Sequence, residues 1–133
     1  KNKMKSIFLF LCALSMLVSV GMGAFGAHGL KKILSPEMMA VYQTGVTYQA
    51  WHGLGLIAIA ILRQQNQVSK LLGFAGWLMF LGVVLFSGSL YLLALTQTTW
   101  FGMVTPFGGV AFLVAWFLIC LYAVKKPERK RYN

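Results

Sequence analysis

The chain has 133 residues, of which 59% are hydrophobic and only 11% are charged, far less charge than a soluble domain of this size needs on its surface. Its formal charge is +10, but the basic residues are confined to short segments between long apolar runs. This arrangement favours a chain threaded through a membrane over a protein that binds nucleic acid. We therefore expect a single all-α domain embedded in a lipid bilayer.

The first apolar run predicts a membrane span over residues 6–27, behind three lysines at the N-terminus. The run imitates a secretory signal, but it is longer than the roughly 7–15 apolar residues of such a signal. We expect the helix to close at His28 and Gly29, because glycine suits the left-handed residue that follows many helix ends.

The second span is preceded by a helix start at Ser35-Pro36-Glu37, where serine can cap and proline fits the first turn. From there the pattern continues without a breaker to Leu62, a length of about 40 Å at 1.5 Å per residue. Because the hydrocarbon core is only about 30 Å thick, we place the membrane-embedded part at residues 44–63.

The third and fourth spans are predicted over residues 71–95 and 105–124. Trp100, in the uncharged loop between them, is the kind of residue found at a membrane interface. Thr105 and Pro106 are expected to start the fourth span as cap and first-turn proline. A basic tail follows over residues 125–133, which we expect to be cytoplasmic.

The distribution of Lys and Arg predicts how the chain is threaded. Ten of the 12 basic residues lie at the two ends of the chain or between the second and third spans, and only Lys31 and Lys32 lie in the other two connections. This is a strong positive-inside asymmetry. It predicts an even number of spans, hence a four-helix transmembrane bundle with both termini in the cytoplasm.

Small residues recur along every span and predict close helix packing, because hydrophobicity does not drive helices together inside a lipid phase. On the first span they follow a four-residue spacing, and on the third span they are glycines. The residues concerned are Ser15, Ser19, Gly23 and Ala27, and Gly73, Gly76, Gly82 and Gly88.

Polar residues inside a membrane are costly and are therefore the candidates for a functional site. On the second span Gln49 and His52 share one helix face, and Tyr48 flanks it. His52 is 11 residues before Arg63, about 16 Å, which places it near the bilayer midplane. Three interpretations of His52 stay open: an interhelical hydrogen bond, a proton relay or ligand contact, and ligation of haem or a metal.

A second polar set is expected to converge nearer the outer face: His28, Gln43, Thr44, Gln49, Ser87, Ser89 and Tyr91. From the two sets together we take one candidate intramembrane polar site, made of His28, Gln43, Tyr48, Gln49, His52, Ser87 and Ser89. His28 and His52 are separated by about half the bilayer, so we do not expect them to be paired axial ligands.

The sequence offers no recognisable catalytic constellation. It contains no Asp, and its two acids, Glu37 and Glu128, lie outside the spans. Neither a phosphate-binding Gly-Lys-Ser/Thr motif nor a His-Glu-x-x-His motif occurs. Cys12 and Cys120 lie in separate apolar runs and predict two small apolar residues rather than a disulfide or metal site. We expect no enzyme, no cofactor and no bound metal.

Five separated motifs resemble, in their order, a bacterial inner-membrane family typified by YgdD. The motifs are Gly23-Ala24-Phe25-Gly26-Ala27-His28, Tyr42-Gln43-Thr44-Gly45, Tyr48-Gln49-Ala50-Trp51-His52, Phe86-Ser87-Gly88-Ser89-Leu90-Tyr91 and Thr105-Pro106-Phe107-Gly108-Gly109. That family has no assigned function and includes a small vertebrate transmembrane relative. The resemblance implies an integral inner-membrane protein and carries over no catalytic or binding residue.

The leading hypothesis is therefore a non-enzymatic accessory subunit or self-assembling module of the inner membrane, a homo-oligomer or part of a larger complex. One alternative is a small transporter or channel component that uses the polar stripe through Gln49 and His52. The other is a cofactor-binding redox subunit centred on His28 or His52.

Overall fold

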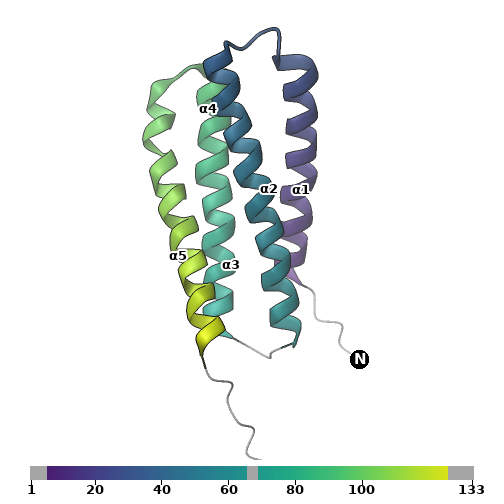
Figure 1. Cartoon of the computed structure of the whole chain (residues 1–133), viewed down its shortest axis with the longest axis vertical. Helices are drawn as coiled ribbons and strands as arrows, with labels where there is room; N and C mark the ends of the chain where they lie inside the picture. The colour runs from purple at the N-terminus through teal and green to yellow at the C-terminus, as the bar shows by residue number, and fades with distance from the viewer. Residues whose placement is uncertain (1–5, 66–68, 126–133) are drawn as a thin grey trace, which may run out of the picture.

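A computed structural model describes residues 6–65 and 69–125 of the chain (Figure 1). Within these ranges the protein is helical and contains no strand. Its four long helical segments, Ile7–Leu30, Pro36–Gln65, Lys70–Thr96 and Thr99–Val124, are each long and apolar enough to cross a membrane. The prediction of an all-α protein with four membrane spans is thus confirmed.

The first segment consists of α1 (Ile7–Phe25) and a π-helical extension, η1 (Gly26–Leu30). The hydroxyl of Ser6 caps α1 by accepting a hydrogen bond from the backbone N–H of Leu9. The predicted left-handed end at Gly29 is wrong, because Gly29 lies inside η1 and Gln97 is the only described residue with a positive φ. The helix ends without such a cap because the Leu30 carbonyl accepts from two later N–H groups, of Ile33 and Leu34.

The second segment is one continuous helix, α2 (Pro36–Gln65). It begins where the sequence predicts, since the Ser35 hydroxyl accepts a hydrogen bond from the N–H of Met38 at 3.1 Å. Its 30 residues correspond to about 45 Å, longer than the hydrocarbon core of a bilayer. A helix of this length either extends beyond that core or crosses it at a tilt.

The third segment is interrupted in its middle. It runs through α3 (Lys70–Gly82), the π-helical η2 (Val83–Ser87) and α4 (Gly88–Thr96). The segment ends at Gln97, which adopts the left-handed conformation with φ of 55°. A π-helical turn inside a longer helix is rare and often marks a functional position.

The fourth segment contains a short 3-10 helix, η3 (Thr99–Met103), followed by α5 (Thr105–Val124). Pro106 lies in the first turn as predicted, but the prediction that Thr105 caps the helix is wrong. The Thr105 hydroxyl is instead hydrogen-bonded to the Ser89 hydroxyl at 2.6 Å, so it joins α5 to α4.

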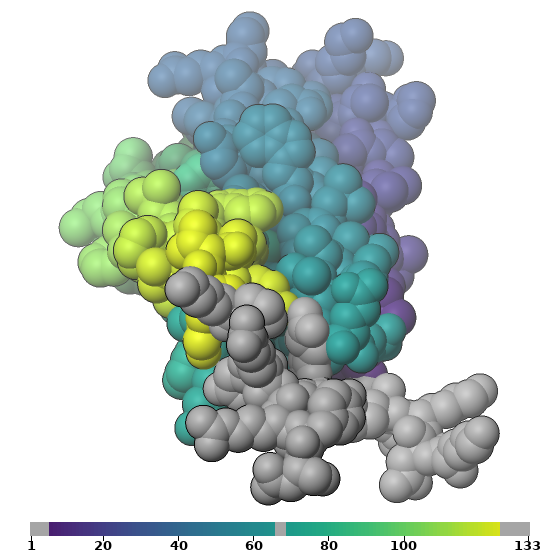
Figure 2. Space-filling model, turned by 60° about the horizontal axis from the view of Figure 1, so that its bottom comes forward, coloured from purple at the N-terminus to yellow at the C-terminus, as the bar shows by residue number. Residues whose placement is uncertain are grey.

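The helices lie side by side in the order α5, α3–α4, α2 and α1 (Figure 1). α1 packs mainly against α2, whereas α5 packs mainly against α3 and η2. Lys31 and Lys32 lie at the end of the bundle that holds the α1–α2 connection, and Arg63, Lys70 and Lys125 lie at the other. At that second end the last turns of α5, in yellow, lie beside teal helices (Figure 2). The three N-terminal lysines and the tail beyond Lys125 lie outside the described residues.

The interior has two apolar clusters with a polar layer between them. The larger cluster, near the start of α1, includes Phe8, Leu56, Ile59, Leu72 and Met79. The smaller one, near the α1–α2 connection, consists of Leu30, Tyr42 and Ala94. The buried polar residues are Ser15, Ser19, Gln49, His52, Ser87 and Ser89. Because polar groups in a membrane interior must find partners within the protein, this layer is the place to look for function.

Candidate functional site

Gln49 is the centre of the polar layer and joins three helices. Its side-chain Nε2 donates to the backbone carbonyl of Ser15 on α1 at 3.0 Å, and its Oε1 accepts from the hydroxyl of Tyr91 on α4 at 2.5 Å. The Ser15 carbonyl can only accept, so it fixes which end of the amide faces α1 and requires the Tyr91 hydroxyl to donate. Gln49 is 4% exposed, and both bonds are interhelical, the kind that holds membrane helices together.

Ser87, the last residue of η2, adds a second link between the third segment and α2. Its hydroxyl donates to the carbonyl of Gly45 at 2.7 Å. Glycine is required at position 45, because a β-carbon there would lie 2.9 Å from the ring of Tyr91. This close approach brings the Tyr91 hydroxyl within reach of Gln49.

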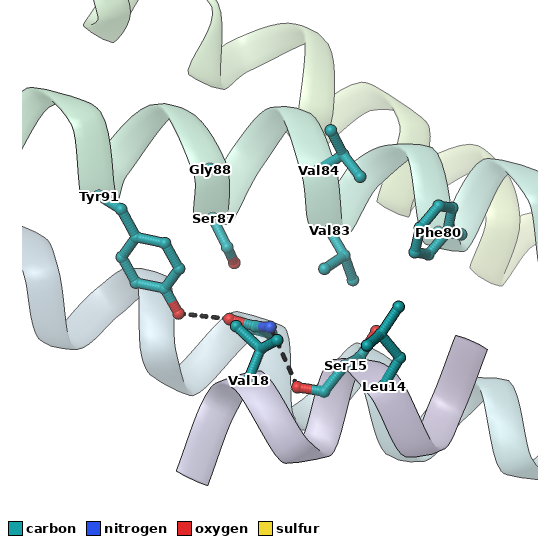
Figure 3. Close-up of a pocket in the computed structure, with 10 residues that line it drawn as sticks. Leu14, Ser15, Val18, Phe80, Val83, Val84, Ser87, Gly88 and Tyr91 are labelled. Carbon is teal, nitrogen blue, oxygen red and sulfur yellow. Dashed lines mark hydrogen bonds between the residues drawn. The ribbon is translucent and has the colours of Figure 1, made fainter. Parts of the chain in front are cut away.

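A groove of about 260 Å³ opens beside these residues, between α1 and the third segment (Figure 3). Gln49 of α2 lies between the two walls. Gly88 lines the groove and has no other atom within 4 Å of the position that a β-carbon would take. The walls of the groove come from α1 on one side and from α3, η2 and α4 on the other: Leu14, Ser15, Val18, Gln49, Phe80, Val83, Val84, Ser87, Gly88 and Tyr91.

Ser15 lines this groove, and its hydroxyl is itself buried and has no hydrogen-bond partner among the described residues. Ser15 is only 3% exposed, so the hydroxyl has lost its access to bulk solvent. A buried polar group without a partner typically costs about 1–3 kcal/mol. Such a group in a folded protein needs an explanation, and a bound molecule is one.

His52 belongs to a different environment, one turn along α2. Its Nδ1 donates to the carbonyl of Tyr48 at 2.7 Å, since a carbonyl can only accept. The imidazole stacks on Phe112 of α5 with ring centroids 3.5 Å apart, and the rings of Tyr48 and Trp116 lie 5.8 Å away. His52 does not line the groove. Its surroundings are those of an aromatic packing element.

The remaining predicted site residues lie apart from the groove. Tyr48 packs its ring against Phe86 at 4.6 Å, and the Ser89 hydroxyl is engaged by the Phe86 carbonyl and by Thr105. His28 and Gln43 are exposed on the outer surface of the bundle. The structure therefore brings together Gln49 and Ser87 from the predicted site and leaves the other five members elsewhere.

Ser15 is a groove residue that the sequence reasoning treated only as part of a packing stripe. The available signal was its depth, because it is a serine estimated to lie within a turn of the level of His52. Among the described residues no group of three or more His, Cys, Asp or Glu side chains is placed to hold a metal ion. Cys12 is buried, Cys120 is exposed, and neither forms a disulfide.

Comparison with known proteins places the chain in a family. A sequence profile described as a protein of unknown function (DUF423) matches residues 22–109. The UPF0382 membrane protein YwdK of Bacillus subtilis is 47% identical over 119 residues, which cover 90% of this chain and 97% of the relative. A UPF0382 membrane protein of Staphylococcus haemolyticus is 48% identical over 119 residues, covering 90% of this chain and 96% of the relative. The chain belongs to this family of membrane proteins of unknown function.

The DUF423 match covers most of the groove but not all of it. It includes Gln49 and the whole third segment, whereas Leu14, Ser15 and Val18 on α1 precede its first residue. The longer alignment to the YwdK relative spans 119 residues. No solved structure matches the chain significantly.

Proposed function

We propose that this protein is a non-enzymatic binding module of the bacterial cytoplasmic membrane, whose groove takes up a lipid-soluble small molecule from the bilayer. The observation that carries the proposal is the Ser15 hydroxyl, buried at 3% exposure and unpartnered among the described residues beside a groove of about 260 Å³. Burial has already removed this hydroxyl from water, and that loss costs free energy. A ligand that accepts a hydrogen bond from it would therefore recover part of that free energy.

The proposal includes a location and an orientation. Both termini face the cytoplasm, because the basic residues concentrate at the end of the bundle where α1 begins and α5 ends. We also propose that this chain is related to the family typified by YgdD and to the small vertebrate relative of that family. The proposed location in the inner membrane rests on this resemblance. A tag at the C-terminus that is labelled only from outside intact cells would contradict this orientation.

The groove is reached from the lipid and not from water. α1 packs mainly on α2, and towards the third segment its Phe8 meets Trp77 with ring centroids 5.4 Å apart. Phe8 lies near the start of α1, below Leu14 and Val18, which line the groove. Beyond that contact the groove lies between α1 and the third segment, and we propose that a molecule dissolved in the bilayer enters it sideways.

The chemistry of the groove suits binding rather than reaction. Its polar members are a carboxamide and three hydroxyl groups, and its other walls are Leu, Val, Phe and Gly. These groups hold and orient a molecule through hydrogen bonds and apolar contact. We therefore propose an accessory role, in which the protein holds its ligand for a partner in a larger membrane complex.

A matched pair of glycine variants tests the proposal. Gly88 and Gly73 both have open space where a side chain would be, but only Gly88 lines the groove. The full-length protein, Gly88→Leu and Gly73→Leu would be purified in nanodiscs and extracted with organic solvent for mass spectrometry. We expect a stoichiometric small molecule in the wild type and in Gly73→Leu, and its loss in Gly88→Leu. Equal contents in all three preparations, or none above empty nanodiscs, would contradict the proposal.

Assembly into a homo-oligomer or a larger complex is a second element of the proposal. Gly21 is exposed on α1, outside the groove, with no atom within 4 Å of its β-carbon position. Surfaces of this kind let membrane helices approach one another closely. We expect Gly21→Leu to lower the oligomeric mass in mild detergent, measured by native mass spectrometry. A wild type that is strictly monomeric and without partners would count against this element.

The transporter and redox alternatives each need His52 or His28 to act on a ligand. The stacking of His52 between aromatic rings favours a packing role, and His28 lies on the outer surface. A proteoliposome flux abolished by His52→Ala would revive the transporter alternative. A Soret band in the absorption spectrum of the purified protein would revive the haem version of the redox alternative.

A further inference from the structure

We infer that the ligand of the groove is a neutral, lipid-soluble carbonyl compound of the quinone class, with one carbonyl oxygen accepting from the Ser15 hydroxyl and the Gln49 amide. This inference rests on the proposed function, because it names the chemistry of the molecule that the groove takes up.

Two polar hydrogens in the groove remain available. The Ser15 hydroxyl has no partner among the described residues. Gln49 Nε2 carries two hydrogens, and the structure shows one bond from it, to the Ser15 carbonyl at 3.0 Å. That bond joins the same two residues, and both residues line the groove, so the two hydrogens belong to neighbouring groups at its wall.

The other hydroxyl groups of the groove have already used their hydrogens. Tyr91 donates to Gln49 Oε1, and Ser87 donates to the Gly45 carbonyl. The unmet demand in the groove is therefore for an acceptor. No residue that lines it carries a charge, so a neutral oxygen suits it better than a carboxylate or phosphate.

The depth of these groups selects among carbonyl compounds. Ser15 lies about 12 Å from the start of the first segment and about 22 Å from its end, counting 1.5 Å per residue from Ile7 to Leu30. Gln49 lies about 20 Å and 24 Å from the two ends of α2. Both are thus close to the middle of a core about 30 Å thick, whereas the polar part of a phospholipid stays at its edges. The matching carbonyl belongs to a molecule that dissolves in the hydrocarbon itself.

The size and lining of the groove suit a ligand with one ring and an apolar tail. The groove's volume of about 260 Å³ is slightly below the usual range of small-molecule sites, which starts at about 300 Å³, so it suits a small group. Phe80 lies towards one end of the groove and Tyr91 towards the other, with Val83 among the apolar residues between them, and this volume is enough for a single ring (Figure 3). An alkyl or prenyl tail can leave through the open side into the bilayer.

The test uses a decyl-substituted benzoquinone as probe and the full-length protein in phosphatidylcholine nanodiscs. Quinones quench tryptophan fluorescence, and Trp77 lies on the α3 side near Phe8. We expect a saturable component in the wild type and in Gly73→Leu, superimposed on linear collisional quenching. Gly88→Leu should lose the saturable component, and Ser15→Ala should weaken it about fivefold, the effect of one neutral hydrogen bond. Ser15→Ala is expected to fold, because the hydroxyl it removes makes no bond within the described residues.

Competition separates this inference from the proposed function. An alkylcyclohexane of the same size, which lacks the carbonyl, and a short-chain diacylglycerol, which carries ester carbonyls, do not quench tryptophan. Each should need at least a tenfold excess over the quinone probe to displace half of it. If the hydrocarbon competes equally, or if Ser15→Ala binds like the wild type, the carbonyl assignment is overturned while groove binding stands. If diacylglycerol competes best, the carbonyl belongs to an ester lipid and the quinone class is overturned. If Gly88→Leu retains the saturable component, both the inference and the proposed function fail.

Discussion

The two faces of the third segment differ in how they use small residues. Towards α5 the segment is closed, because Gly108 presses against the backbone of Phe86 and the ring of Phe112 lies over Gly82. Towards α1 it is open, because Gly88 faces the groove with empty space around it. Glycine thus allows close packing on the face towards α5 and leaves open space on the face towards α1. The difference depends on how closely the neighbouring helix approaches.

The polar groups follow the same division. On the closed face Ser89 is engaged by Thr105 and by the Phe86 carbonyl, and His52 is stacked on Phe112. On the open face Tyr91 donates to Gln49 and Gln49 donates to the Ser15 carbonyl, while Ser87 donates separately to the Gly45 carbonyl. The Ser15 hydroxyl there has no partner among the described residues. A fully satisfied face stabilises the bundle, whereas a face with an unused donor is available for a ligand.

The largest difference between the two faces is expected when one methyl group is added to each, at Gly108 on the closed face and at Gly88 on the open face. A β-carbon at Gly108 would overlap the backbone nitrogen of Phe86, which cannot move as a flexible side chain can. We expect Gly108→Ala to lower the free energy of unfolding by about 2–3 kcal/mol, within the range for overpacking. Gly88→Ala should leave it unchanged or raise it by up to about 1 kcal/mol, since alanine favours helix over glycine.

Denaturant titration in mixed micelles would measure both variants. Equal destabilisation by the two substitutions would show that the open face is in fact packed, and the groove would then have no room for a ligand.

A smaller effect is expected from cutting the polar chain at its centre. Gln49→Leu removes the bonds to the Ser15 carbonyl and the Tyr91 hydroxyl. Interhelical hydrogen bonds in membrane proteins contribute about 0.6–1.7 kcal/mol each, so we expect a loss of about 1–3 kcal/mol. The double variant with Tyr91→Phe should be less than additive, because both substitutions remove the same bond. Strict additivity would mean that the two side chains are not coupled.

Alanine substitutions at two serines are expected to change the free energy of unfolding with different signs. Ser87→Ala removes the donor to the Gly45 carbonyl and should destabilise the protein by about 0.6–1 kcal/mol. Ser15→Ala removes a buried hydroxyl that has no partner among the described residues, so it should be neutral or stabilise the empty protein by up to about 1 kcal/mol. Thermal unfolding of both variants in the same detergent, after removal of lipid-soluble molecules, gives the two signs. Destabilisation by Ser15→Ala would show that its hydroxyl has a partner.

The smallest effect is predicted for His52→Phe. Phenylalanine keeps the stack on Phe112 and loses only the bond from Nδ1 to the Tyr48 carbonyl, which is local to α2. We expect a change in the free energy of unfolding within about 0.5 kcal/mol and no effect on probe binding in the groove. A large loss of binding with an unchanged free energy of unfolding would show that His52 acts in ligand binding and not in packing.

Part of the candidate site was predictable from the sequence. Gln49 stood out because an amide in the middle of an apolar span is costly, and Ser87 was selected at a similar depth. Estimates of depth could not say which way each side chain points around its helix axis. That is why Ser89, two residues from Ser87, lies against α5, and why Gln43 and His28 lie on the outer surface.

The helical class, the number of spans and the starts of most helices follow from the sequence, because the bilayer imposes a length and a hydropathy that depend on local residues. The cap at Ser35 is an example, since it depends only on residues three positions apart. The tertiary structure was needed to show that α1 packs mainly on α2 and that Gly88 has open space around it while Gly108 packs against the Phe86 backbone. It was also needed to show that the Ser15 hydroxyl has no partner among the described residues. These properties depend on which helix faces which, and that pairing is set by side-chain fit between segments far apart in the chain.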